Sequence, residues 1–160
     1  MKQNSTVKEQ SLNPQPAART QTQPQVVSET CDDKLDERIC TALQAASEKK
    51  AIEPVVLDLR EIASFTDYFV IVSGANERQV QAISDEVSET LKKAGEPAIR
   101  VEGYKTAEWI LLDYGDFVVH VFEQKARKFF DLERLWRESK RVELPAELTG
   151  EGPSSLRKES

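Results

Sequence analysis

The most informative pattern of the chain lies in residues 109–122, where two apolar segments flank the polar break Asp113-Tyr114-Gly115-Asp116. A glycine in a short polar break between β-forming segments is typical of a tight hairpin. Side chains alternate along the first strand, with Trp109, Leu111 and Asp113 on one face and Ile110, Leu112 and Tyr114 on the other. Since both faces are largely apolar, one should pack on helices and the other on more of the chain or on a partner.

The remaining pattern predicts helices that alternate with strands. Apolar spacing of three and four residues predicts a helix from a cap at Asp32 or Asp33 to Lys50, and another from Asn76 to Gly95. A last helix should bury Phe129, Leu132, Leu135 and Trp136 and leave Arg127 in solvent. Strands are predicted at 55–59, 67–74 and 98–102. The order α-β-β-α-β-β-β-α indicates a single α/β domain with a mixed sheet of about five strands and flanking helices.

The ends of the chain differ from this domain in composition. Residues 1–30 hold three prolines among polar side chains, and residues 145–160 are rich in Gly, Pro and Ser. Such segments bury too little apolar surface to offset the entropy of ordering. We therefore expect disordered tails at 1–30 and 145–160, and a folded domain at 31–144.

The charge of the chain indicates which kind of partner it can bind, and its cysteines and lack of targeting segments indicate where in the cell it acts. A net charge of -6 disfavours a direct grip on nucleic acid and suits a basic protein partner. Cys31 and Cys40, nine residues apart on one predicted helix, would lie about 13.5 Å apart and could not pair. With no signal-peptide pattern, no transit segment and no long apolar run, we expect a cytoplasmic protein rather than an organellar one.

Two groups of residues suggest an enzyme. Ser73-Gly74 before a capped helix could cradle a phosphate, with Asp58, Asp67 or Asp113 holding a metal for nucleotidyl transfer. A single glycine without a phosphate-binding motif favours an ordinary strand-to-helix turn. The acids and the imidazole of Asp113, Asp116, His120 and Glu123 could form a metal or acid–base site. Alternation places Glu123 on the opposite face from Asp116 and His120, so we expect no metal and no cofactor.

A binding surface is the competing interpretation of the hairpin. Trp109 and Tyr114 beside Asp113 and Asp116 have the composition of an interface anchor with a charged rim. A core position for Trp109 is about as frequent for such a residue. His120, between two valines of a strand, is more typical of a packed core or interface group than of a catalyst.

Several motifs closely resemble one family. D-L-R-E-I-A-S-F-T-D-Y-F-V-I-V-S-G, W-I-L-L-D-Y-G-D-F-V-V-H-V-F and R-K-F-F-D-L-E-R-L-W are similar to the ribosomal silencing factor, or Iojap-like, family. The resemblance covers residues 31–144. It implies a nucleotidyltransferase-like fold without the catalytic carboxylates, and hence a protein that is not an enzyme.

The resemblance also implies a function and a site. Family members bind large-subunit ribosomal protein number fourteen, block joining of the small subunit and repress translation when nutrients are scarce. The partner-binding residues carried over by the motif are Trp109, Leu111, Asp113, Tyr114, Asp116 and the hairpin histidine His120. A homodimer is expected away from the ribosome, and Phe130 stands where the family usually has Tyr.

Overall fold

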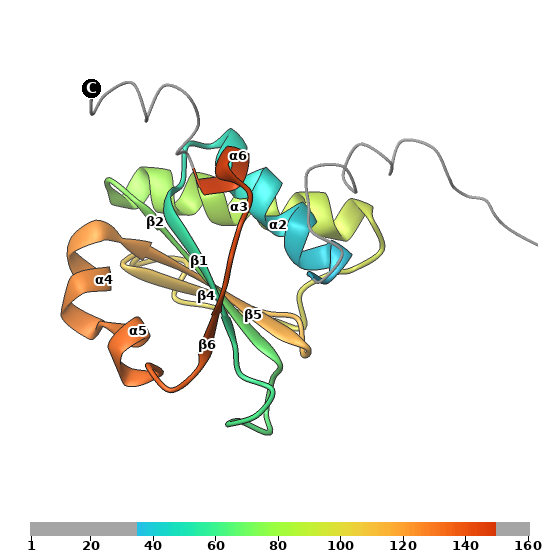
Figure 1. The fold of residues 1–160 in the computed structure, drawn as a ribbon. Coiled ribbons are helices and arrows are strands. Elements are labelled where there is room, and N and C mark those ends of the chain that lie inside the picture. Colours follow the sequence, from blue (N-terminus) through green and yellow to red (C-terminus); the bar gives the residue numbers. More distant parts are fainter. Residues whose placement is uncertain (1–34, 150–160) are drawn as a thin grey trace, which may run out of the picture.

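A computed structural model describes residues 35–149, so the predicted tail at 1–30 and residues 150–160 lie outside the described part. The chain forms a single mixed α/β domain around a six-stranded sheet with the strand order β3-β4-β5-β2-β1-β6 (Figure 1). The strands are β1 (Ile52–Asp58), β2 (Tyr68–Gly74), β3 (Arg100–Glu102), β4 (Trp109–Asp113), β5 (Phe117–Glu123) and β6 (Lys140–Val142). The sequence pattern predicts all of these except β6.

The centre of the sheet is a parallel pair flanked by antiparallel strands. β2 runs parallel to β5, from Tyr68 opposite Phe117 to Gly74 opposite Glu123. β4 and β5 form the predicted antiparallel hairpin, in which Trp109 pairs with Phe122 and Asp113 with Val118. β1 and β2 are antiparallel neighbours, as their short connection predicts, and β3 and β6 are the two edges.

The helices α2 (Glu37–Glu48) and α3 (Glu77–Lys93) pack side by side on one face of the sheet (Figure 1). The side chain of Asn76 accepts a hydrogen bond from Gln79 N at 2.9 Å, which confirms the predicted cap of α3. Asp36 caps α2, so this helix begins later than predicted. Cys31 therefore precedes α2 and lies outside the described residues, and helix geometry no longer argues against its pairing.

The predicted last helix is instead two short helices, α4 (Gln124–Phe130) and α5 (Leu132–Leu135). Asp131 separates them with a left-handed backbone (φ 48°, ψ 55°). The break changes the direction of the chain, so the predicted apolar stripe does not form. Leu132 is buried, whereas Phe129 and Leu135 are 80% and 71% exposed. Arg127, predicted in solvent, is buried.

The fold continues past Leu144, where the sequence pattern predicts its end. β6 pairs with β1, and α6 (Ala146–Thr149) follows. Leu148 is buried in the core with residues of α2 and β1. The ordered domain therefore extends to Thr149, five residues beyond its predicted limit.

The sheet separates two apolar cores. The first lies under α2 and α3 and includes Ile110, Leu112, Phe117 and Val121. The second lies under α4 and α5 and includes Phe69, Val118, Phe122 and Leu132. Since α4 and α5 are short, this second face is incompletely covered.

Candidate partner-binding surface

The uncovered part of the second face lies over β4 and the edge strand β3. Trp109 and Leu111 are only half-buried there. Together with Glu102 and Gly103 they line a shallow depression of about 240 Å³. Ile110 and Leu112 point to the opposite, helix-covered core, which confirms the face assignment made from the alternation of the sequence.

Neighbouring rings and one hydrogen bond hold Trp109 in place. Its indole stacks on Phe122, with the ring centroids 4.9 Å apart. The indole Nε1 donates a hydrogen bond to His120 Nδ1 at 3.0 Å. Because Nδ1 accepts this bond, the neutral imidazole carries its proton on Nε2. The contact therefore fixes both the orientation of Trp109 and the tautomer of His120.

His120 is buried beneath this surface. It is 3% exposed, and Phe69 packs against it edge-on with the ring centroids 4.4 Å apart. Burial lowers its pKa to about 3, so the ring is neutral at physiological pH. His120 is thus a support for Trp109, and the prediction that it contacts a partner needs correction, since its side chain is covered.

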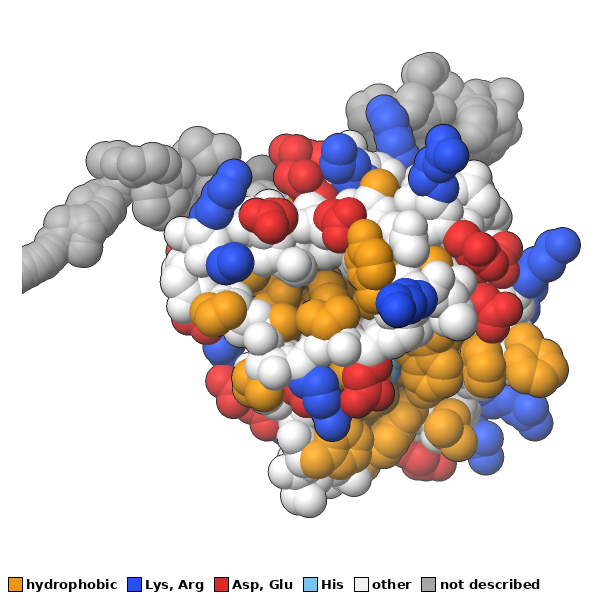
Figure 2. All heavy atoms as spheres, turned by 180° about the vertical axis from the view of Figure 1, so that it is seen from behind, with side chains coloured by type: hydrophobic (Ala, Val, Ile, Leu, Met, Phe, Trp, Pro, Cys, Tyr) orange, Lys and Arg blue, Asp and Glu red, His pale blue; other side chains and the backbone are white. Residues whose placement is uncertain are grey.

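Two phenylalanines that the sequence analysis did not assign to the site extend the surface. The rings of Trp109 and Phe130 lie 4.9 Å apart, and those of Phe130 and Phe129 lie 5.0 Å apart. We call Trp109, Leu111, Phe129 and Phe130 the aromatic surface. Hydrophobic side chains gather on this side of the molecule, at the lower right of Figure 2. The sequence contained a sign of this exposure, because two adjacent residues of a helix cannot both point into the core and one of two neighbouring phenylalanines must therefore face outward.

The two predicted rim acids already have arginine partners. Asp113 Oδ1 accepts a hydrogen bond from Gly115 N at 2.9 Å, and its Oδ2 lies 3.3 Å from Arg100 Nη2. Asp116 Oδ2 lies 2.9 Å from Arg38 Nη2. Both acids stand beside the hairpin turn, as predicted, but each is partly neutralised within the chain.

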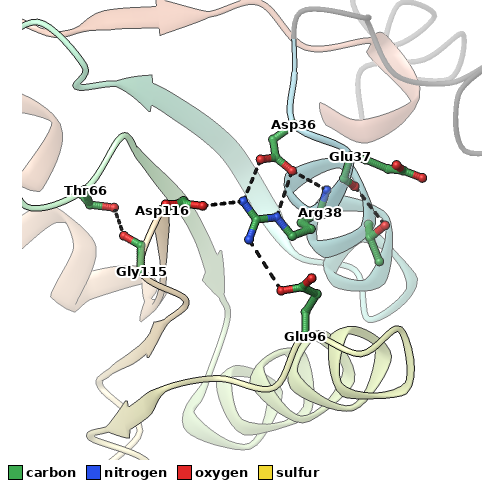
Figure 3. Close-up of polar contacts among 8 residues, drawn as sticks. Asp36, Glu37, Arg38, Thr66, Glu96, Gly115 and Asp116 are labelled. Carbon is green, nitrogen blue, oxygen red and sulfur yellow. Dashed lines mark hydrogen bonds and ion pairs between the residues drawn. The ribbon is translucent and has the colours of Figure 1, made fainter.

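Arg38 joins the hairpin turn to the start of α2. Its guanidinium lies among the carboxylates of Asp36, Asp116 and Glu96, at 2.9, 2.9 and 3.6 Å (Figure 3). Thr66 Oγ1 donates to Gly115 O at 2.9 Å from the other side. The turn is therefore held from two directions, and Asp116 contributes one of these contacts.

Tyr114 belongs to the first core and does not lie on the aromatic surface. It is 7% exposed and stacks on Phe117 with the ring centroids 4.9 Å apart. Burial raises the pKa of its hydroxyl to about 12. The prediction that Tyr114 contacts a partner is wrong for this structure, because alternation already places it with Ile110 and Leu112.

The residues suggested for nucleotidyl transfer lie at opposite ends of the sheet. Gly74 ends β2, whereas Asp67 precedes β2, and Asp58 pairs with Tyr68 at that same beginning. Six strand rises of about 3.3 Å, roughly 20 Å, separate these ends. A Cβ on Gly74 would lie 3.0 Å from Val80 N, so this glycine permits close packing of α3. The turn and the acids do not form one site.

The second suggested cluster is also dispersed. Glu123 lies at the far end of β5 from Asp116, and its Oε1 caps α4 by accepting from Lys125 N at 3.1 Å. Within residues 35–149, no three His, Cys, Asp or Glu side chains are arranged to hold a metal ion. None of the helices in that range is long and apolar enough to cross a membrane.

Comparison with known proteins adds independent information. A family model described as ribosomal silencing factor during starvation matches residues 32–159. "Ribosomal silencing factor RsfS" of Halalkalibacterium halodurans is 42% identical over 103 residues, which are 64% of this chain and 88% of the relative. "Mitochondrial assembly of ribosomal large subunit protein 1" of Mus musculus is 33% identical over 75 residues, 45% of this chain and 33% of that protein. A crystal structure from Bacillus halodurans is 41% identical with a TM-score of 0.59, covering 65% of this chain and 94% of the other.

Proposed function

Because this chain belongs to the family of ribosomal silencing factors during starvation, we propose that it binds the large ribosomal subunit and represses translation when nutrients are scarce. The binding site is ribosomal protein number fourteen of the large subunit, and the bound domain blocks joining of the small subunit. The protein acts in the bacterial cytoplasm and needs no cofactor. Its self-association away from the ribosome stays a prediction.

The aromatic surface is the observation that supports this proposal. Interfaces are enriched in aromatic side chains, and a few large rings near the centre usually carry most of the binding energy. Trp109 is suited to this role, because Phe122 and His120 hold the indole in one orientation. A side chain that is already ordered loses less entropy when a partner docks on it.

Steric exclusion is the mechanism that fits such a surface. It requires a folded body that stays fixed on the large subunit where the small subunit must dock, and no chemical step. The domain provides a sheet with an apolar core on each face, and the aromatic surface lies where the second face is incompletely covered. Its acidic total charge of -6 favours a basic ribosomal protein as the contact and accelerates that encounter.

Co-sedimentation with purified large subunits tests the proposal. Trp109→Ala should weaken binding by about thirtyfold or more, since truncation of an anchoring aromatic side chain costs ~2 kcal/mol or more. Because Trp109 also packs on Phe122, thermal unfolding of this variant must be measured in parallel. Phe130→Ala provides a second probe, because Phe130 is 43% exposed and lies at the margin of the core.

Phe65→Ala is the matched control, because Phe65 is 60% exposed and lies outside the aromatic surface, in the connection between β1 and β2. It should bind like the unaltered protein. If Trp109→Ala and Phe130→Ala both fold and both bind large subunits with native affinity, the aromatic surface is not the site that contacts the ribosome, and this part of the proposal is wrong.

A further inference from the structure

The charge of the molecule is divided unevenly between two parts of the chain. Residues 124–142, which form α4, α5 and β6, contain seven Lys or Arg and three Asp or Glu. This segment therefore has a net charge of +4, and the rest of the chain has -10 within the total of -6. The total charge, which disfavours nucleic acid, conceals a basic region.

Most of these cations are available to a partner. Six of the seven are exposed, the exception being Arg127. Two of the exposed six form ion pairs, Lys140 with Glu61 and Arg141 with Glu133. The other four, Lys125, Lys128, Arg134 and Arg137, make no ion pair within the part of the chain that the structure describes. We call these four residues the basic face.

Exposed apolar side chains lie among the four cations. Phe129 and Leu135, 80% and 71% exposed, each follow directly after a cation of the basic face. Lys and Arg side chains border the hydrophobic side chains at the lower right of Figure 2. Unpaired cations bind phosphate groups, and an exposed aromatic ring can stack on an unpaired base.

We propose that the basic face binds the phosphate backbone of RNA, with Phe129 available for stacking on a base. RNA is favoured over an acidic protein because the four cations are spread over α4, α5 and the turn after α5, as suits an extended phosphate chain, rather than converging on one carboxylate. Since Phe129 belongs to the aromatic surface and directly follows Lys128 of the basic face, the two surfaces adjoin and one large subunit could contact both. This inference extends the proposed function. It rests on that function in one respect, which is that the RNA is identified as the RNA of the large subunit.

Salt dependence of RNA binding tests the inference directly. The full chain is titrated with deproteinised large-subunit RNA at increasing potassium chloride, and the same titration is made with Arg134→Gln plus Arg137→Gln. The loss of two phosphate contacts should make the plot of log affinity against log salt shallower by about 1.5. Phe129→Ala should weaken binding and leave this slope unchanged.

Lys92→Gln plus Lys93→Gln is the matched control, because it removes two exposed cations from α3, which covers the other face of the sheet. Its slope should equal that of the unaltered protein. An equal loss in both double variants would overturn the inference, as would an unaltered protein that does not bind the deproteinised RNA. Trp109→Ala should still bind this RNA, although it should bind intact large subunits more weakly. The RNA titration therefore tests the basic face, and co-sedimentation with large subunits tests the aromatic surface.

Discussion

The burial of His120 makes the stability of the domain depend on pH. The folded protein keeps His120 neutral down to a pKa of about 3, whereas an unfolded chain takes up the proton near the ordinary value of 6.5. Between these values the unfolded state binds one proton more than the folded state. The free energy of unfolding therefore decreases as the pH falls from 6.5, by up to about 1.4 kcal/mol per pH unit.

We expect His120→Gln to remove most of this slope between pH 6.5 and 5, as measured by urea unfolding at several pH values. The carboxyl groups of Asp36 and Asp58 should not contribute to the slope in that range. Hydrogen bonds from Arg38 and Arg60 hold the pKa values of Asp36 and Asp58 below their usual range, so their contribution is lost only at lower pH. An unchanged slope in the variant would show that another group titrates.

Gly103 beside the depression should tolerate no side chain. Its φ is +81°, and a Cβ there would collide with the carbonyl oxygen of Trp109. Gly103→Ala should therefore destabilise the domain by more than about 2 kcal/mol and displace Trp109. Gly95→Ala is the control, because Gly95 has a similar φ of +89° but open space around the new Cβ, so it should cost about 1 kcal/mol. Equal losses in thermal unfolding would contradict the proposed collision.

At the level of the elements, Arg127 connects α4 with α5, β1 and β2. Its Nη1 donates to Ser73 Oγ at 2.8 Å and to Ile52 O at 3.3 Å. Its Nε and Nη2 donate to the two carboxylate oxygens of Glu133 at 3.1 and 3.0 Å. Ile52 begins the bulge of β1, where the register shifts between Ile52 and Val55. Arg127 therefore contacts β1 at the edge of this bulge.

Arg127→Met should destabilise the domain by about 3 kcal/mol, because it leaves a partly buried carboxylate with fewer partners. Burial raises the pKa of Glu133, but Arg127 and Arg141 outweigh this effect and hold the pKa below its usual range. The variant should therefore show a raised Glu133 pKa in an NMR titration. Adding Glu133→Gln should recover part of the lost stability, and a strictly additive loss would mean that the two side chains are not coupled.

The short helix α6 is a second element whose contribution can be measured. Leu148 is 5% exposed and packs in the core under α2. Leu148→Ala should reduce the free energy of unfolding by about 3 kcal/mol, within the usual range for a buried leucine. Leu135→Ala is the matched control, since Leu135 is 71% exposed and should cost little. Similar small losses in both variants would show that α6 does not contribute to the core.

For the whole molecule, the sequence predicts elements best where periodicity, caps and turns agree. The helix after Asn76 has regular apolar spacing, a capping residue and a terminal glycine, and it forms as α3. The hairpin has alternation and a glycine turn, and it forms as β4 and β5. β6 has only three residues, two of them charged, so its pairing with β1 depends on tertiary contacts that no local pattern contains.

The candidate site was predictable only in part, because it too depends on tertiary contacts that no local pattern contains. Alternation correctly separates Trp109 and Leu111 from Ile110 and Leu112, but it cannot tell which face the helices cover. Phe129 and Phe130 end α4, and the predicted last helix divides after them because Asp131 adopts a left-handed conformation, which a non-glycine residue rarely does. The uneven charge of residues 124–142 was visible in the sequence, yet the total of -6 hides it.

The parallel pairing of β2 with β5 sets the order in which the domain can form during its own synthesis. Residues 68–74 find their central neighbour only in residues 117–123, so a nascent chain that ends at Asp113 lacks two of the six strands, including β5, which joins β2 to β4. β2 must wait for almost fifty more residues, with one edge paired only to β1. Such a strand exposes unpaired backbone groups and apolar side chains until β5 leaves the exit tunnel. A protein proposed to silence ribosomes thus depends on one ribosome completing its last third before it can fold.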